Sequence, residues 1–284
     1  MAESGEWRWW PAPAKLNLFL HITARRADGF HELQTVFQLV DLCDAVGIAP
    51  RDDGILEMLE GAPGVAPEQD LALRAARLLQ LHTGTRLGAS LKLKKRIPMG
   101  GGLGGGSSDA ATVLRVLDHL WGTGLGPEKL GLLGLALGSD VPVFVAGSSA
   151  WGEGRGERLT PVELPERWFL ILHPGPAIST ASVFQAPELT RNSPVLTIRA
   201  ILRDDGRNDC EPVVRVRYPE VAEALDWLGA HAAARLSGTG ACLFASFGRA
   251  ADAERVAARV PDRWRAWVAR GLQRSPLVDA LATE

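Results

Sequence analysis

The chain has 284 residues, and its 31 lysines and arginines nearly balance its 33 aspartates and glutamates, giving a formal net charge of −2. This balance argues against broad nucleic-acid binding, which normally needs a basic surplus. No apolar run approaches the ~18 residues that a membrane helix requires, so we expect no membrane partner. With 46% hydrophobic and 23% charged residues, the composition is that of a globular protein with one large domain or two medium ones.

The N-terminal sequence and the cysteines indicate the compartment. The start, MAESGEWRWWPAP, contains two acidic residues and lacks the apolar segment of a secretory signal. The three cysteines, Cys43, Cys210 and Cys242, are an odd number without C-x-x-C spacing, so neither a disulfide framework nor a zinc site is predicted. We therefore expect a cytoplasmic protein.

Apolar alternation and helical spacing predict strands and helices in an irregular order. The first half is predicted to contain a strand at Pro13–Ile22, extended chain at His31–Pro50, helix at Gln69–His82, strand at Ala89–Ile97, a helix starting near Ser107 and a helix at Pro127–Leu137. Strands at Val143–Ala150, Arg158–Leu164 and Trp168–His173 follow, then helix at Glu220–Leu236, strand at Ala241–Phe247, helix at Ala250–Val260 and strand at Trp264–Gly271. The mixture favours an α+β class over a doubly wound parallel sheet. A change of pattern predicts domains at residues 1–160 and 161–284.

Glycine is concentrated in one segment. The chain has 31 glycines, and six of them fall within Pro98–Ala111, PMGGGLGGGSSDAA. This segment connects a predicted strand to a predicted helix, with Ser107 or Ser108 as the expected N-cap. Glycines there allow positive φ and let backbone N–H groups approach a ligand closely. Because a helix N-terminus adds partial positive charge, phosphate is the expected ligand.

Three other interpretations of the glycine segment were weighed. A Walker A loop requires G-K-[ST], which the segment lacks. A dinucleotide-binding G-x-G-x-x-G matches Gly100, Gly102 and Gly105, but a run of six glycines produces that match easily, and no acidic residue ends a second strand about 20 positions on. A turn that is merely flexible remains a possible interpretation. However, ordering six glycines costs more conformational entropy than ordering other residues, and that cost needs a reason.

The string P-x-G-x-G-L-G-G-G-S-S resembles the phosphate loop of the GHMP kinases, a family named for galactose, homoserine, mevalonate and phosphomevalonate kinases. The resemblance implies a two-domain α+β fold, with a ribosomal-protein-S5-like N-terminal domain and a ferredoxin-like C-terminal domain. It also implies ATP as co-substrate and Mg²⁺ as the partner of ATP, without assigning a protein ligand to the metal. We expect a monomer or homodimer. The residues implied to bind ATP are Pro98, Met99, Gly100, Gly101, Gly102, Leu103, Gly104, Gly105, Gly106, Ser107 and Ser108.

Five sequence blocks narrow the resemblance within the family. They are PAKLNLFL, RADGFHELQTVFQLVD, PMGGGLGGGSSDAATVL, LGSDVPVF and LSGTGACLFA, which together span Pro13 to Ala245. They are similar to a group of these kinases that phosphorylates a small alcohol carrying a cytidine diphosphate. The alternative is another alcohol kinase of the family, similar to homoserine or mevalonate kinase, which needs no cytosine site. A non-catalytic nucleotide-binding protein and a dehydrogenase are the alternatives from other classes.

Two charged residues in these blocks are candidate catalytic residues. Asp140 precedes Val-Pro, where an aspartate commonly caps a turn or helix. The resemblance implies instead a base that takes the proton of the substrate hydroxyl. Lys15 fits an exposed strand lysine, but it shares a predicted strand face with Asn17 and His21, and the resemblance places it beside the aspartate. Such a pair would position the hydroxyl and neutralise charge during phosphoryl transfer.

Aromatic residues outside the glycine segment are candidate cytosine contacts. Phe30 and His31 fit a packed hairpin tip equally well, but the resemblance makes them part of a cytosine clamp with Phe184. Stacking of this kind is worth about 1–3 kcal/mol per base. Asn17 and Thr180 are implied to contact the alcohol or its diphosphate.

A second glycine motif, Gly238-Thr239-Gly240, follows the predicted helix at Glu220–Leu236. The resemblance implies that it braces the phosphate loop from the second domain. Gly238 is explained equally well as the residue that ends the helix.

Overall fold

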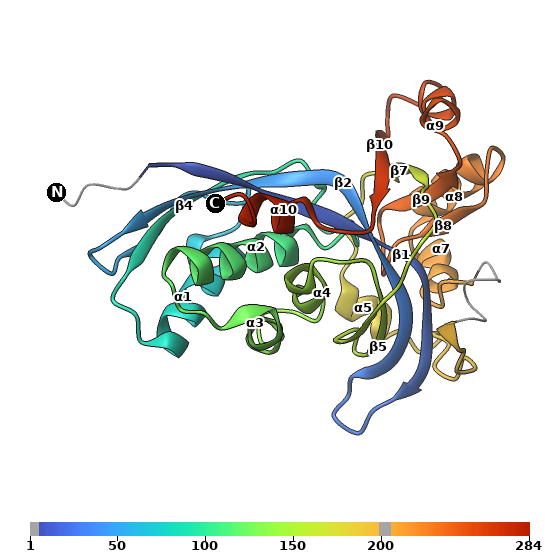
Figure 1. Cartoon of the computed structure of the whole chain (residues 1–284). Helices are drawn as coiled ribbons and strands as arrows, with labels where there is room; N and C mark the ends of the chain where they lie inside the picture. The colour runs from blue at the N-terminus through green and yellow to red at the C-terminus, as the bar shows by residue number, and fades with distance from the viewer. Residues whose placement is uncertain (1–5, 199–205) are drawn as a thin grey trace.

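A long antiparallel ribbon of two strands extends across the molecule (Figure 1). It consists of β1, Arg8–Arg25, and β2, His31–Arg51, which pair from Arg8 opposite Ile48 to Arg25 opposite His31. The register shifts between Asn17 and Leu20, so the simple alternation of faces expected for this strand breaks there. The computed structural model describes residues 6–198 and 206–284, and all statements below refer to these residues.

The remaining elements follow the ribbon in chain order. They are β3 (Leu56–Glu60), a 3-10 helix (Pro67–Gln69), α1 (Leu71–Thr83), β4 (Gly88–Lys94), α2 (Gly105–Leu120), α3 (Gly126–Gly134), α4 (Val141–Ala146), β5 (Ala150–Gly154), β6 (Arg158–Pro161), β7 (Trp168–His173), α5 (Thr180–Phe184), α7 (Glu211–Arg217), α8 (Pro219–Gly229), β8 (Ala234–Leu236), β9 (Leu243–Phe247), α9 (Ala250–Ala257), β10 (Arg265–Leu272) and α10 (Pro276–Leu281).

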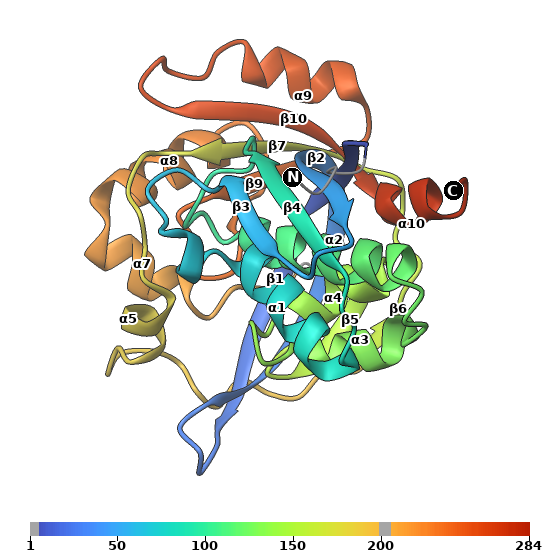
Figure 2. The ribbon, with the colours of Figure 1, turned by 90° about the vertical axis from the view of Figure 1, so that its left-hand side faces the viewer.

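One mixed sheet connects the two ends of the chain. Its strand order is β3-β4-β2-β10-β7-β9-β8, while β1 and β5 also pair with β2. Strand β10 joins the first half to the second, because Gly271 and Leu272 pair with Val40 and Leu39 of β2 while the rest of β10 pairs with β7. In Figure 2, β10 runs along β7, and its end nearest to α10 lies above β2. The α+β class predicted from the sequence is confirmed.

Two hydrophobic cores lie against this sheet. The first packs α1, α2, α3 and α4 against β2 and β4, and its fully buried members include Leu79, Leu91 and Leu117. The second packs α7 and α8 against β7 and β9 around Leu170 and Leu225. In Figure 1 the four helices of the first core lie to the left of the lower part of the ribbon, and those of the second lie to its right. The long β1–β2 ribbon thus contacts both cores and can carry site residues between them.

Two predicted elements are wrong. The first half of the strand predicted at Val143–Ala150 belongs to helix α4, because Pro142 sits in the first helical turn and Gly147, with φ of 69°, ends the helix. Burial of its apolar residues in the first core overrides their β propensity. The helix predicted at Glu220–Leu236 ends at Gly229, since Ala234–Leu236 pairs with β9.

The predicted domain division falls at the end of β6, whose last residue is Pro161. The next strand, β7, begins at Trp168 and belongs to the second core. The division at residues 160 and 161 stays a prediction. In the described parts of the chain no helix is long and apolar enough to cross a membrane.

Candidate active site

The glycine segment is a tight loop between β4 and α2. Gly100, Gly102 and Gly104 have φ values of 68°, 75° and 73°, a backbone region that other residues rarely adopt. The predicted serine N-cap is wrong: α2 begins at Gly105, its N-cap is Gly104, and no side chain caps it. With its positive φ, Gly104 places the N-cap three residues before Ser107 and four before Ser108. The first N–H groups of α2 therefore have no side-chain acceptor and are available to an anion.

The turn between β8 and β9 packs against this loop. Backbone N–H groups of Ala241 and Cys242 donate to the carbonyl oxygens of Gly100 and Gly101, at 3.3 and 3.0 Å. A Cβ added at Gly102 would collide with the carbonyl oxygen of Ser237. The motif Gly238-Thr239-Gly240 is part of this turn, so it connects two strands and not, as predicted, a helix to a strand. Close backbone packing explains why glycine is needed here.

Lys15 is buried at the centre of these segments, with 3% of its side chain exposed. Its ammonium donates to Asn17 Oδ1 at 2.6 Å and to the carbonyl oxygen of Gly102 at 3.0 Å. Asn17 in turn donates to Thr35 Oγ1 at 2.9 Å. Ser237 donates to the same Gly102 oxygen at 3.1 Å. The alternative of an exposed strand lysine is excluded, because these acceptors fix Lys15 between the β1–β2 ribbon and the glycine loop.

Asp140 is the partner of the buried Lys15 and is itself partly exposed. Its Oδ2 lies 3.2 Å from Lys15 Nζ, and 31% of its side chain is exposed. It stands at the start of α4 but makes no side-chain capping bond there. The capping role considered from the sequence is therefore absent, and the carboxylate is directed to the lysine while remaining open to a ligand.

A cavity of about 490 Å³ covers the glycine loop. Asp140 and Thr180 lie at its edge, and Lys95 and Asp109 form part of its wall. Ten of the eleven residues predicted to bind ATP line this cavity, namely Pro98, Met99, Gly100, Gly101, Gly102, Leu103, Gly104, Gly105, Gly106 and Ser107. The exception, Ser108, is fully buried inside α2. We refer to this space as the nucleotide cavity.

A second cavity, of about 640 Å³, is lined by Phe30, His31, Thr180 and Phe184. A smaller space of about 110 Å³ is lined by Lys15, Asn17, Asp140, Thr180 and Phe184, among others. Thr180 lines all three spaces, and its hydroxyl lies 2.9 Å from that of Thr239. The lysine–aspartate pair therefore lies where the nucleotide cavity meets the second cavity, which we call the substrate cavity.

His31 is fixed by Phe184, which was predicted at this site, and by Arg191, which was not. Its ring stacks on Phe184, with centroids 5.2 Å apart, and its Nε2 accepts from Arg191 Nε at 3.1 Å. Burial, together with the charges of Arg191 and Arg25, lowers the pKa of His31 below its usual value. Because Nε2 accepts this bond, the neutral ring carries its proton on Nδ1. Arg191 belongs to no recognised motif, so no sequence signal pointed to it.

A buried ion cluster lies under the nucleotide cavity. Lys95 pairs with both Asp44 and Asp109, whose side chains are 0% and 2% exposed. Asp44 Oδ1 also accepts the backbone N–H of Ile97 at 2.8 Å. Burial raises the pKa of Asp109, and the nearby charge of Lys95 opposes that effect. The cluster ties the end of β4 to α2, the two elements that the glycine loop connects.

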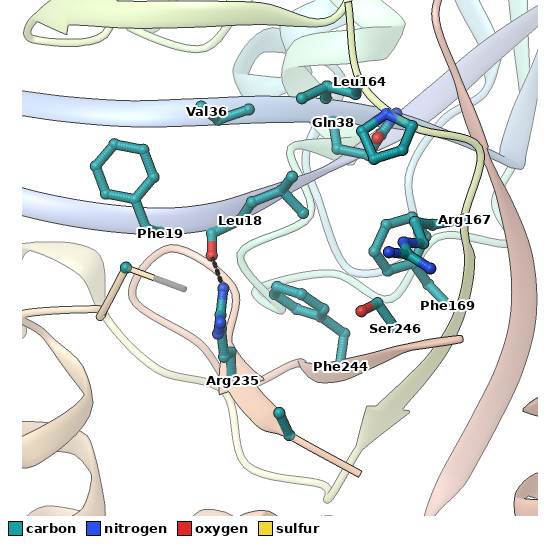
Figure 3. Close-up of a pocket in the computed structure, with 13 residues that line it drawn as sticks. Leu18, Phe19, Val36, Gln38, Leu164, Arg167, Phe169, Arg235, Phe244 and Ser246 are labelled. Carbon is teal, nitrogen blue, oxygen red and sulfur yellow. Dashed lines mark hydrogen bonds between the residues drawn. The ribbon is translucent and has the colours of Figure 1, made fainter. Parts of the chain in front are cut away.

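A further cavity, of about 300 Å³, lies where β1 and β2 meet β7 and β9 (Figure 3). Phe19, Phe169 and Phe244 form apolar walls, and Arg235 donates to the carbonyl oxygen of Leu18 at 3.0 Å. None of the predicted site residues lines it. We therefore assign the candidate active site to the other three spaces.

A glycine loop at a helix start, a buried lysine paired with a partly exposed aspartate, and two cavities that meet at this pair are features of a small-molecule kinase. The model for the GHMP kinases N terminal domain matches residues 70–148, and that for the GHMP kinases C terminal domain matches residues 188–266. The chain belongs to the GHMP kinase family. The family predicted from the glycine segment is confirmed.

The most similar relatives share one name. The chain is 56% identical over 280 residues to the 4-diphosphocytidyl-2-C-methyl-D-erythritol kinase of Halorhodospira halophila, covering 98% of this chain and 97% of that relative. It is 57% identical over 277 residues to the kinase of the same name from Alkalilimnicola ehrlichii, covering 98% and 95%. A solved 4-(cytidine 5'-diphospho)-2C-methyl-D-erythritol kinase superposes with a TM-score of 0.82 at 36% identity, covering 93% of this chain and 99% of that chain. Homoserine kinase from Cytophaga hutchinsonii superposes with a TM-score of 0.70 at 17% identity, over 96% of this chain and 97% of that chain, which shows the fold alone.

Proposed function

We propose that the protein transfers the γ-phosphoryl group of ATP to the 2-hydroxyl of 4-diphosphocytidyl-2-C-methyl-D-erythritol. The products are the 2-phosphate and ADP, and the step belongs to the non-mevalonate route to isoprenoid precursors. The observation that carries this proposal is the position of the Lys15–Asp140 pair, 3.2 Å apart, where the nucleotide and substrate cavities meet. The near full-length identity to kinases named for this substrate supports the same choice.

ATP would place its phosphates over the glycine loop. The uncapped N-terminus of α2 supplies N–H donors and partial positive charge, and the loop glycines let the backbone approach the phosphates. Mg²⁺ bound to ATP would neutralise charge that develops on the transferred group. Among residues 6–198 and 206–284, no group of three His, Cys, Asp or Glu side chains could hold a metal. Because Mg²⁺ with ATP needs only one or two protein oxygens, Ser107, which lines the cavity, fits this requirement.

Asp140 would act as the base. The substrate hydroxyl oxygen attacks the γ-phosphorus, the bond from that phosphorus to the β,γ-bridging oxygen breaks, and the hydroxyl proton passes to the Asp140 carboxylate. Lys15 is fixed by Asn17 and by the Gly102 carbonyl oxygen. It would therefore hold Asp140 in place and stabilise negative charge on the attacking oxygen.

The substrate cavity would bind the cytidylyl end. His31 and Phe184 present aromatic surface, and the neutral His31 ring can donate from Nδ1 to a base edge. Phe30, which is 47% exposed, would supply a second stacking surface. Thr180 and Asn17 line the small space together with Lys15 and Asp140, where they would contact the alcohol.

The protein would act in the cytoplasm, which fits its three free thiols.

The test is a coupled assay of ADP release with purified protein, ATP and Mg²⁺. We expect turnover with 4-diphosphocytidyl-2-C-methyl-D-erythritol and none above background with homoserine, mevalonate or free 2-C-methyl-D-erythritol. Product analysis should place the new phosphate on the 2-hydroxyl. Turnover of homoserine or mevalonate in preference to the cytidylylated alcohol would overturn the proposal.

A further inference from the structure

Arg155 lies in the turn between β5 and β6, beside the substrate cavity. The turn is well fixed: Gly156 N–H donates to the Glu153 carbonyl oxygen at 3.0 Å, and the Arg155 backbone N–H donates to the Glu157 carboxylate. The guanidinium carbon of Arg155 lies 3.7 Å from the centroid of the Phe30 ring. Phe30, which would stack on the cytosine, is thus in direct contact with the positive charge of Arg155.

Arg155 also lines two of the spaces described above. One is the substrate cavity, which it lines together with Phe30 and His31, and the other is the small space around Lys15 and Asp140. It therefore lies between the surface that would stack on cytosine and the pair that would act on the hydroxyl. In the proposed substrate, the chemical group between the nucleoside and the alcohol is a diphosphate.

Arg155 has unused hydrogen-bonding capacity. Its Nε is buried without a hydrogen-bond partner, and within the described ranges no carboxylate forms a salt bridge with its side chain. Its neighbours differ, because Arg26 pairs with Asp28 at 3.0 Å and Arg158 lies 3.6 Å from Glu32. A buried donor without an acceptor is costly, so an acceptor supplied by a ligand would remove this cost.

We propose that Arg155 binds the diphosphate of the substrate and so selects a nucleoside-diphosphate-linked alcohol over a free alcohol. The planar guanidinium matches phosphate oxygens with two parallel hydrogen bonds, which a lysine cannot do. Its contact with Phe30 holds it in place in the absence of substrate. This inference rests on the proposed function, because it assumes that the ligand carries a diphosphate next to a nucleoside.

The kinetic test compares Arg155→Met and Arg155→Lys with Arg158→Met, a control that removes an exposed arginine three positions away. Charge-assisted hydrogen bonds are worth about 1.5–3 kcal/mol, or roughly 10- to 150-fold in affinity. We therefore expect Arg155→Met to raise KM for the cytidylylated alcohol by this factor, while kcat and KM for ATP change less than about threefold. Arg155→Lys should fall between, and Arg158→Met should resemble the unmodified protein.

A binding test separates the phosphate contact from support of Phe30. We would titrate the unmodified protein and Arg155→Met with CDP and with cytidine. Arg155→Met should weaken CDP binding at least about tenfold and leave cytidine binding unchanged. Equal weakening of both, or no change in KM for the cytidylylated alcohol, would overturn the assignment of Arg155. If the unmodified protein fails to turn over that substrate at all, it is the proposed function that fails.

Discussion

The two halves of the candidate active site are built in different ways. The loop that lines the nucleotide cavity is rich in glycine and is held by backbone hydrogen bonds from the β8–β9 turn. The substrate cavity is lined by residues from the ends of β1 and β2, from turns and from the short helix α5, among them the exposed Phe30. Under the proposed function, the phosphates of ATP would be bound mainly by backbone geometry and the alcohol by side chains.

The largest effect is expected where the two halves meet. Asp140→Ala should lower kcat about 10²- to 10⁴-fold, because proton transfer to a positioned base is lost. Binding of ATP, measured by calorimetry, should change little, since it depends on the loop backbone. The control is Asp226→Ala, which removes an exposed aspartate from α8 and should leave kcat unchanged. Full activity of Asp140→Ala would show that the pair is not catalytic.

The second-largest effect is expected for the buried ion cluster of Lys95, Asp44 and Asp109, which lies under the nucleotide cavity. Lys95→Met leaves two buried carboxylates unpaired, so we expect a loss of about 3–5 kcal/mol in the free energy of unfolding. Urea denaturation measures this loss. Adding Asp109→Asn removes one of the charges and should recover part of the stability. Lys129→Met, on the surface of α3, is the control. A single variant as stable as the control would show that the cluster is not structural.

Backbone packing in the loop can be tested with two glycines of similar conformation. Gly102 has φ of 75° and Gly124 has φ of 64°, but only Gly102 lies against backbone, while Gly124 faces open space. Gly124→Ala should cost about 1 kcal/mol, the strain of a left-handed alanine. Gly102→Ala should cost about 2–4 kcal/mol and weaken ATP binding, because its Cβ meets Ser237. Equal losses would mean that conformation alone, not packing, requires glycine here.

Substitutions in the substrate cavity should lower the affinity for the cytidylylated alcohol without lowering the stability of the protein. His31→Ala removes a stacking surface, so we expect KM for the cytidylylated alcohol to rise about tenfold, within the 1–3 kcal/mol range of base stacking. KM for ATP should stay within about twofold of the original value. The exposed His82→Ala at the end of α1 serves as the control. An equal rise in both KM values would remove His31 from the cytosine site.

The smallest effect is a pH dependence at the same residue. Because the pKa of His31 is lowered on folding, the unfolded chain takes up a proton first as the pH falls below about 6.5. The contribution of His31 to stability is therefore present at neutral pH and is lost as the solution becomes acidic. Thermal unfolding of the original chain and of His31→Gln between pH 7 and pH 5 measures the difference. Parallel curves would contradict a lowered pKa.

The same comparison explains what could be predicted from the sequence. The glycine loop could be predicted from its local pattern, a run of glycines between an expected strand and an expected helix, whereas the pairing of Lys15 with Asp140 was implied only by the family resemblance of the blocks that contain them. Arg155 and Arg191 come from turns without a motif, and only the folded chain brings them to Phe30 and His31. Helix α4 was mistaken for a strand because its residues are β-branched and apolar, and its burial is decided by α2 and α3. Contacts between distant segments were thus the part that local patterns could not predict.

The place of β10 in the sheet has a consequence for biosynthesis. Strand β10 lies between β2 and β7, yet its residues, Arg265–Leu272, are synthesised after all the other strands of that sheet. A nascent chain that already contains Lys15, Asp140 and the glycine loop still lacks the strand that joins their sheet to β7 and β9. We therefore expect phosphoryl transfer from ATP by the partly made enzyme to be prevented until β10 has been synthesised. Stalled chains ending before and after β10 would show this by their rates of ADP release, and equal rates would exclude it.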